Sequence, residues 1–153
     1  MGYAPKKIRP SWEDRFRRPS FQDLREDLHE PMGGLVDFAR ERLASVPGVV
    51  EELAWQGVPW RWTLLYRLGS DPAHAWAYLV PDPTAPKFVM PIARSVVDAL
   101  PWNRLKKHVR DGVTQGRLVN NVYWATWDLA SKTQLAELLA VAEQTRKILA
   151  ARN

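Results

Sequence analysis

The sequence of 153 residues contains no cysteine. Disulfides, thiolate zinc sites, iron–sulfur clusters and cysteine nucleophiles are therefore excluded together. The sequence also has no apolar run near the ~20 residues that a membrane-spanning helix needs. Its first residues are basic and include proline, without the apolar stretch of a secretory signal. We therefore expect a cytoplasmic protein that does not enter a membrane.

Recognised catalytic signatures are missing as well. There is no GxSxG elbow, P-loop, GxGxxG fingerprint, HExxH helix or EF-hand loop. The histidines His29, His74 and His108 are far apart, and no two have the i, i+4 spacing that sets two imidazoles on one helical face for a metal. The sequence predicts neither a metal site nor a cofactor, so an enzyme would have to rely on scattered residues.

The remaining composition is that of a globular protein, with 46% hydrophobic and 25% charged residues. A chain of this length can bury one self-sufficient core, which predicts a single domain over residues 20–153. The net charge of +5 is concentrated in residues 1–19, where six basic residues stand against two acidic ones. Because Pro5, Pro10 and Pro19 prevent a continuous helix there, we expect a basic extended arm.

Hydrophobic periodicity predicts an α+β fold. Helical spacing marks the segments 20–29, 35–46, 49–54, 95–100, 102–113 and 131–149. Strand alternation marks the segments 60–68, 74–80, 87–92 and 121–127. We expect a four-stranded, mainly antiparallel sheet, built from a three-strand meander plus one later strand, with helices packed on one face.

The alternation within residues 60–68 predicts which side of the sheet is the core. Its larger apolar side chains are Trp60, Trp62, Leu64 and Tyr66. We expect this face to pack against the helices that contain Phe38, Leu105 and Leu139.

The eight tryptophans indicate that the second face of the sheet is not fully polar. Trp124 and Trp127 are an odd number of positions apart and so emerge on opposite faces of one strand. In residues 74–80 both alternating sets are apolar, with Trp76, Tyr78 and Val80 in one of them. The arm, a second subunit or a flat apolar ligand must therefore cover this face, and we predict a homodimer.

Three residues of the first strand give this second face a polar character. Arg61, Thr63 and Arg67 lie on its non-core side, and we expect them beside Trp124 and Trp127. The planar guanidinium of arginine suits a carboxylate or a phosphate, which predicts a small anionic or aromatic ligand. The competing interpretation is that both arginines are surface residues paired with neighbouring carboxylates.

One family resemblance emerges from the order of the elements. Two helices, the stretch WQGVPWRW, a three-stranded meander, a helix pair and YWATWDL before a last helix resemble the small bacterial YdhG-like domains of unknown function. The resemblance covers about residues 35–149 and includes the tryptophan and tyrosine positions. It implies the same α+β fold and brings no catalytic residue with it.

Three functions are compatible with the sequence, in decreasing order of preference. The first is a non-catalytic interaction or small-ligand-binding module that associates with itself. The second is an enzyme acting on a small anionic substrate through a cleft lined by Arg61 and Arg67, with His108 or Glu52 nearby. The third is nucleic-acid binding through the basic arm, but we expect nucleic acid not to be a partner because residues 20–153 carry little net charge.

Overall fold

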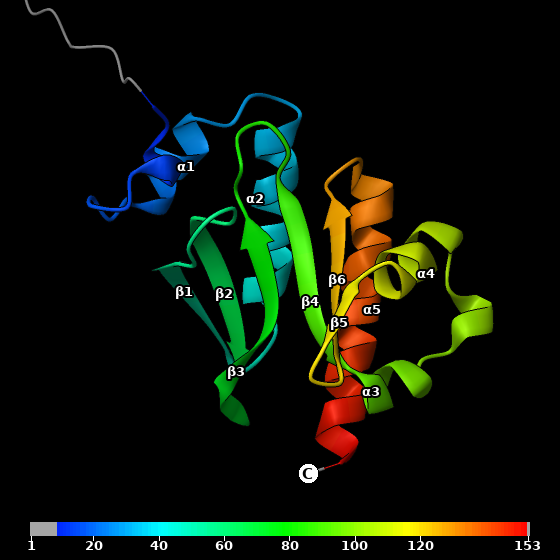
Figure 1. Cartoon of the computed structure of the whole chain (residues 1–153). Helices are drawn as coiled ribbons and strands as arrows, with labels where there is room; N and C mark the ends of the chain where they lie inside the picture. Colours follow the sequence, from blue (N-terminus) through cyan, green and yellow to red (C-terminus); the bar gives the residue numbers. More distant parts are fainter. Residues whose placement is uncertain (1–8, 153) are drawn as a thin grey trace, which may run out of the picture.

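Six strands form an antiparallel sheet in the computed structural model, which describes residues 9–152 (Figure 1). The strands are β1 (Val49–Trp55), β2 (Trp62–Leu68), β3 (Asp71–Val80), β4 (Lys87–Ala93), β5 (Arg117–Val119) and β6 (Val122–Asp128). The helices are α1 (Phe21–Glu26), α2 (Met32–Ala44), α3 (Arg94–Asp98), α4 (Lys107–Thr114) and α5 (Lys132–Ala151), with short 3-10 turns η1 (Ser11–Glu13) and η2 (Trp102–Arg104).

The strands pair in the order β1-β2-β3-β4-β6-β5, with every neighbouring pair antiparallel. The class is α+β, but the predicted number of four strands is wrong. The sheet gains β1, which the sequence analysis predicts as a helix, and β5, which it does not predict. Both additional strands lie at the edges, so the predicted meander is the centre of a wider sheet.

Strand β1 replaces the helix predicted at residues 49–54. Its residues pair with β2 over their full length, from Val49 opposite Leu68 to Trp55 opposite Trp62. Glu51 points to the helical side, where it accepts hydrogen bonds from Arg40 and from the Tyr66 hydroxyl. In so short a run the apolar positions fit both the helical and the strand period. The segment forms a strand because it pairs with β2.

Strand β5 forms a hairpin with β6. The two connecting residues, Asn120 and Asn121, have positive φ angles of 51° and 63°. Both central residues of a type I′ turn need such angles, and asparagine tolerates them better than most residues. The strand has three exposed residues, too few for a recognisable alternation.

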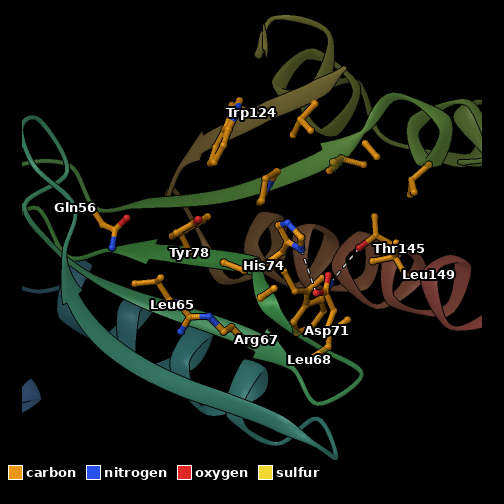
Figure 2. Close-up of a pocket in the computed structure, with 18 residues that line it drawn as sticks. Gln56, Leu65, Arg67, Leu68, Asp71, His74, Tyr78, Trp124, Thr145 and Leu149 are labelled. Atoms are coloured by element: carbon orange, nitrogen blue, oxygen red, sulfur yellow. Dashed lines mark hydrogen bonds and ion pairs between the residues drawn. The ribbon is translucent and has the colours of Figure 1, made fainter. Parts of the chain in front are cut away.

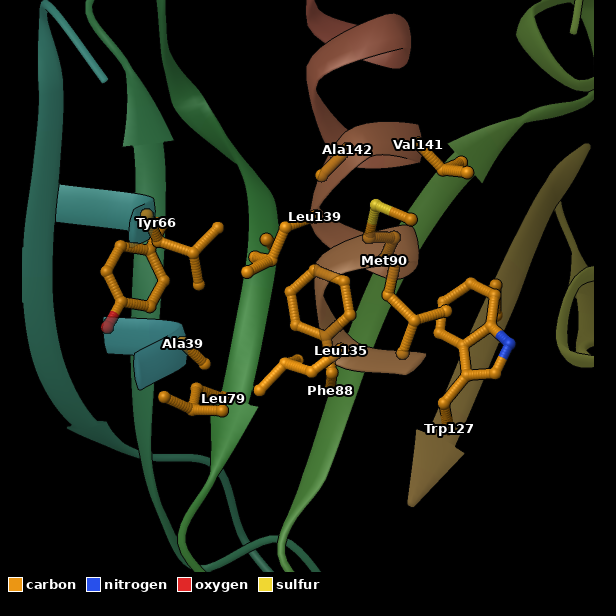
Figure 3. Close-up of a cluster of buried hydrophobic side chains, with 14 of the residues drawn as sticks. Ala39, Tyr66, Leu79, Phe88, Met90, Trp127, Leu135, Leu139, Val141 and Ala142 are labelled. Carbon is orange, nitrogen blue, oxygen red and sulfur yellow. The ribbon is translucent and has the colours of Figure 1, made fainter. Parts of the chain in front are cut away.

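Helices α2 and α5 lie side by side across one face of the sheet and form the main core with it (Figures 1 and 3). Tyr66, Phe88 and Leu135 are among its largest fully buried side chains. The predicted core face of β2 is confirmed for Leu64 and Tyr66. It is wrong for Trp60 and Trp62, because the arm and not the helices covers that end of the strand and both side chains pack in a second cluster. Of the helix residues predicted to meet it, Leu139 is buried, while Phe38 and Leu105 are partly buried at its margin.

A β-bulge in β3 turns Trp76 towards this core. Tyr66 is opposite Ala77 and Arg67 is opposite Ala75, so Trp76 has no partner in β2. Its Nε1 donates to the carbonyl of Ala142 in α5 at 3.1 Å. The expectation that Trp76 shares a face with Tyr78 is therefore wrong, because one extra residue in a strand reverses the side-chain alternation beyond it.

The described part of the arm docks onto the sheet through Trp12. This side chain is only 6% exposed, and its Nε1 donates to the carbonyl of Trp60 at 2.9 Å. The indole of Trp62 in turn donates to the carbonyl of Asp14 at 2.7 Å. A second, smaller core results, whose buried members are Trp12, Leu24, Trp62, Val80 and Val89. Predictions for residues 1–8 of the arm lie outside the described residues.

Candidate functional site

A cavity of about 530 Å³ hollows the part of the helix-free sheet face that the arm does not cover (Figure 2). Its lining includes Leu65, Arg67, Tyr78, Trp124, Thr145 and Leu149. The first four residues belong to the strands and the last two to α5. The cavity therefore reaches from the open face of the sheet, between its strands, to the helix behind it.

The cavity exists because β3 and β4 diverge. Among the described residues the two strands pair only between Tyr78–Val80 and Lys87–Val89. The bulge at Trp76 bends β3 on one side, while β4 continues along β6 on the other. Pro91, which has no N–H to donate, lies two residues beyond the last paired position of β4. The resulting gap is floored by Thr145 and Leu149 (Figure 2).

Aromatic rings form the wall at the closed end of the gap. Tyr78 and Trp124 lie 5.9 Å apart between ring centroids, and Trp60 packs edge-on against both at 5.0 and 6.0 Å. Such offset and edge-on contacts are the favourable geometries of aromatic pairs. Trp60 thus fixes the two rings that face the cavity.

Arg67 and Tyr78 supply hydrogen-bond donors along this apolar wall. Glu52 accepts from Nη1 of Arg67, and within residues 9–152 the Nε and Nη2 atoms of this guanidinium have no partner. The Tyr78 hydroxyl likewise has no hydrogen-bond partner in the described part of the chain. Burial raises the pKa of this hydroxyl, and the charge of Arg67 offsets part of the rise, so it stays a neutral donor at pH 7.

A second polar pair lies at the other end of the cavity. Nδ1 of His74 is 3.1 Å from Oδ1 of Asp71, and both residues are exposed where β3 begins. Figure 2 shows this pair near Leu149 and distant from Trp124. The two ends of the cavity therefore differ, because one is aromatic with hydrogen-bond donors and the other is an exposed polar pair.

The predicted site residues separate into three groups. Arg67 and Trp124 meet at the cavity. Arg61 lies before β2, with its guanidinium 5.2 Å from the Trp12 ring, and Thr63 is fully buried beneath the same turn. Trp127 lies on the opposite face, stacked on Phe88 in the main core.

The cavity also contains residues that the sequence analysis did not select. The sequence places Tyr78 in a strand that is apolar on both sides, although its hydroxyl is the polar feature of that wall. Gln56 follows β1, which was predicted as a helix, so nothing placed it at a sheet face. The pairing of Leu65 with Tyr78 places the Tyr78 side chain on this face, but it depends on the strand register.

No helix within residues 9–152 is long and apolar enough to cross a membrane. No protein-family model matches the sequence, and a search of curated proteins finds no relative. The resemblance to YdhG-like domains therefore stays a prediction.

Proposed function

We propose that this protein binds a small molecule with an apolar body and one anionic group, such as a carboxylate, without catalysing a reaction on it. The observation that carries this proposal is the set of unused donors on Arg67 and Tyr78 beside an apolar wall. The cavity volume of about 530 Å³ lies within the ~300–1,000 Å³ typical of small-molecule sites.

The anionic group would lie between Arg67 and Tyr78. A carboxylate needs donors when it leaves water, and a guanidinium with two free nitrogen atoms offers them in a planar fork. The adjacent hydroxyl adds a third donor because it is neutral at pH 7. Since Glu52 already holds one edge of Arg67, the guanidinium is positioned before a ligand arrives.

The apolar body would extend from Trp124 towards α5. Leu65 on β2 is buried, and Trp124 on β6 is partly exposed. At the far end Leu149 lines the cavity and is 36% exposed. A ligand chain that covers it gains ~25 cal/mol for each Å² of apolar surface removed from water.

Calorimetric titration with decanoate and decanol tests both parts of the proposal. The two probes share an alkyl chain and differ in charge. We expect decanoate to bind at least roughly tenfold more tightly, since a hydrogen bond to a charged group contributes about 1.5–3 kcal/mol. Arg67→Gln is expected to abolish this preference while decanol still binds, whereas Trp124→Ala weakens both probes.

Lys87→Gln is the matched control, because Lys87 lies on the same sheet face but pairs with Asp128 outside the cavity lining. It is expected to bind both probes like the unaltered protein. The proposal is wrong if neither probe binds at millimolar concentration, or if Arg67→Gln and Lys87→Gln reduce decanoate binding equally.

A further inference from the structure

Two segments of residues 20–153 carry net charges of opposite sign, which cancel when they are added. Residues 20–93 contain six basic and ten acidic side chains, whereas residues 94–117 contain six basic and two acidic ones. The basic segment comprises α3, η2, α4 and β5, which lie at the side of the molecule opposite α1 and β1 (Figure 1). The low net charge of residues 20–153 therefore hides a basic side.

The cations of this side are available to a partner. Arg104 lies on η2, Lys106 and Lys107 at the start of α4, and Arg117 on β5, all four exposed, with Arg110 half-exposed on α4. We call these five residues the α4 basic surface. Among the described residues only Lys107 has a carboxylate partner, Asp111.

Several arginines in other parts of the structure form ion pairs, unlike most of the α4 basic surface. Arg25 pairs with two carboxylates, Arg40 with Glu51 and Arg146 with Glu143. Those arginines stabilise the folded structure through ion pairs, whereas four members of the α4 basic surface form no ion pair within residues 9–152. Clustered cations that the fold does not use raise the local positive potential and attract polyanions.

We propose that the α4 basic surface binds the phosphate backbone of nucleic acid. Nucleic-acid interfaces are strongly basic, while the centres of protein interfaces are depleted in lysine and rich in aromatic anchors. The large exposed apolar residues of this side are Leu118 and Val119 on β5, two aliphatic side chains that are too few for such a centre. Helix α4 packs beside Trp127 on the helical face of the sheet, away from the ligand cavity. Arg117 is opposite Trp124 in the β5–β6 ladder, so the α4 basic surface continues from α4 to the edge strand of the sheet.

Fluorescence anisotropy with a labelled 20-base-pair duplex DNA at several NaCl concentrations tests the proposal. Five phosphate contacts predict a slope of log K against log[salt] of about −4.5, at about 0.9 for each contact. Removing two charges with Arg104→Gln and Lys106→Gln is expected to reduce the slope by about 1.8. Both side chains are exposed, so melting temperatures are expected to stay the same.

Two control pairs remove the same charge elsewhere. Arg42→Gln with Lys147→Gln changes exposed residues of α2 and α5, and Arg15→Gln with Arg17→Gln changes the arm. We expect both controls to keep the slope of the unaltered protein. An equal reduction of the salt slope in all three variants would mean that only the net charge of the protein matters. A reduction confined to the arm pair would mean that the arm binds the DNA. Either result overturns the proposal, as does binding of polyglutamate in preference to DNA.

Discussion

Replacing Trp12 by alanine tests whether the arm is part of the folded unit. The indole is 6% exposed, donates to the carbonyl of Trp60 and lies beneath the guanidinium of Arg61. Truncating a buried tryptophan costs about 3–5 kcal/mol. Because Trp12 is near the end of the chain, the arm can rearrange instead of leaving a rigid cavity, so we expect about 3 kcal/mol. For a chain of this size that loss lowers Tm by about 6–12 °C.

Urea unfolding followed by far-ultraviolet circular dichroism gives the free energy directly. Phe16→Ala is the matched control, since Phe16 is an aromatic residue of the same arm with 94% exposure. It is expected to change stability by less than about 0.5 kcal/mol. If Trp12→Ala is as mild as Phe16→Ala, the docked arm does not stabilise the sheet and the reasoning fails.

Three further predictions concern the core and the assembly. Burial and the hydrogen bond to Glu51 raise the pKa of Tyr66. The free energy of unfolding is therefore expected to fall above about pH 10, where tyrosines of the unfolded chain ionise. Tyr66→Phe is expected to make this fall less steep in urea unfolding measurements. Gly112→Ala is expected to destabilise the protein by about 1–3 kcal/mol, because the new Cβ would lie 1.9 Å from Nε1 of Trp127. In an exposed helix the same substitution would stabilise. An unchanged melting temperature would contradict the prediction. Sedimentation equilibrium is expected to give a dimer of the 17.6 kDa chain, and a monomer at micromolar concentration would mean that the arm covers enough of the second face.

The sequence predicts those features whose interacting residues are close together in the chain, such as helix caps. At the start of α1 the Ser20 hydroxyl accepts from the backbone N–H of Asp23, and the Asp23 carboxylate accepts from the backbone N–H of Ser20, which together form a capping box. Ser131 likewise caps α5 through the backbone N–H of Gln134 at 3.2 Å. Both interactions lie within four residues, so the sequence alone contains all the information they need.

Features that depend on distant partners were not predictable in this way. The run from Val49 to Trp55 has both helical and strand character, and its conformation is decided by β2. The bulge at Trp76 depends on Ala142 and Thr145 of α5, which are more than sixty positions away. Sequence patterns record which residues are apolar, but not which remote surface they meet.

The candidate site also combines features that the local sequence predicts with features that depend on distant partners. Arg67 and Trp124 reach the cavity because strand alternation fixes their face of the sheet. Arg61 was placed with them by extending that alternation beyond the strand. It has a positive φ angle of 60° in the preceding turn, where alternation no longer applies. The cavity itself could not be foreseen, because it follows from the separation of two central strands.

That separation divides the sheet into two three-stranded ribbons, β1-β2-β3 and β4-β6-β5, held together by three residue pairs. On the opposite face one hydrophobic core joins both ribbons through α5, so the sparse hydrogen bonding between them is confined to the side on which the cavity opens. A molecule bound in the cavity would contact both ribbons at once. Because Trp124 belongs to one ribbon and Arg67 to the other, such a molecule would link the two halves of the sheet where only three residue pairs connect their strands.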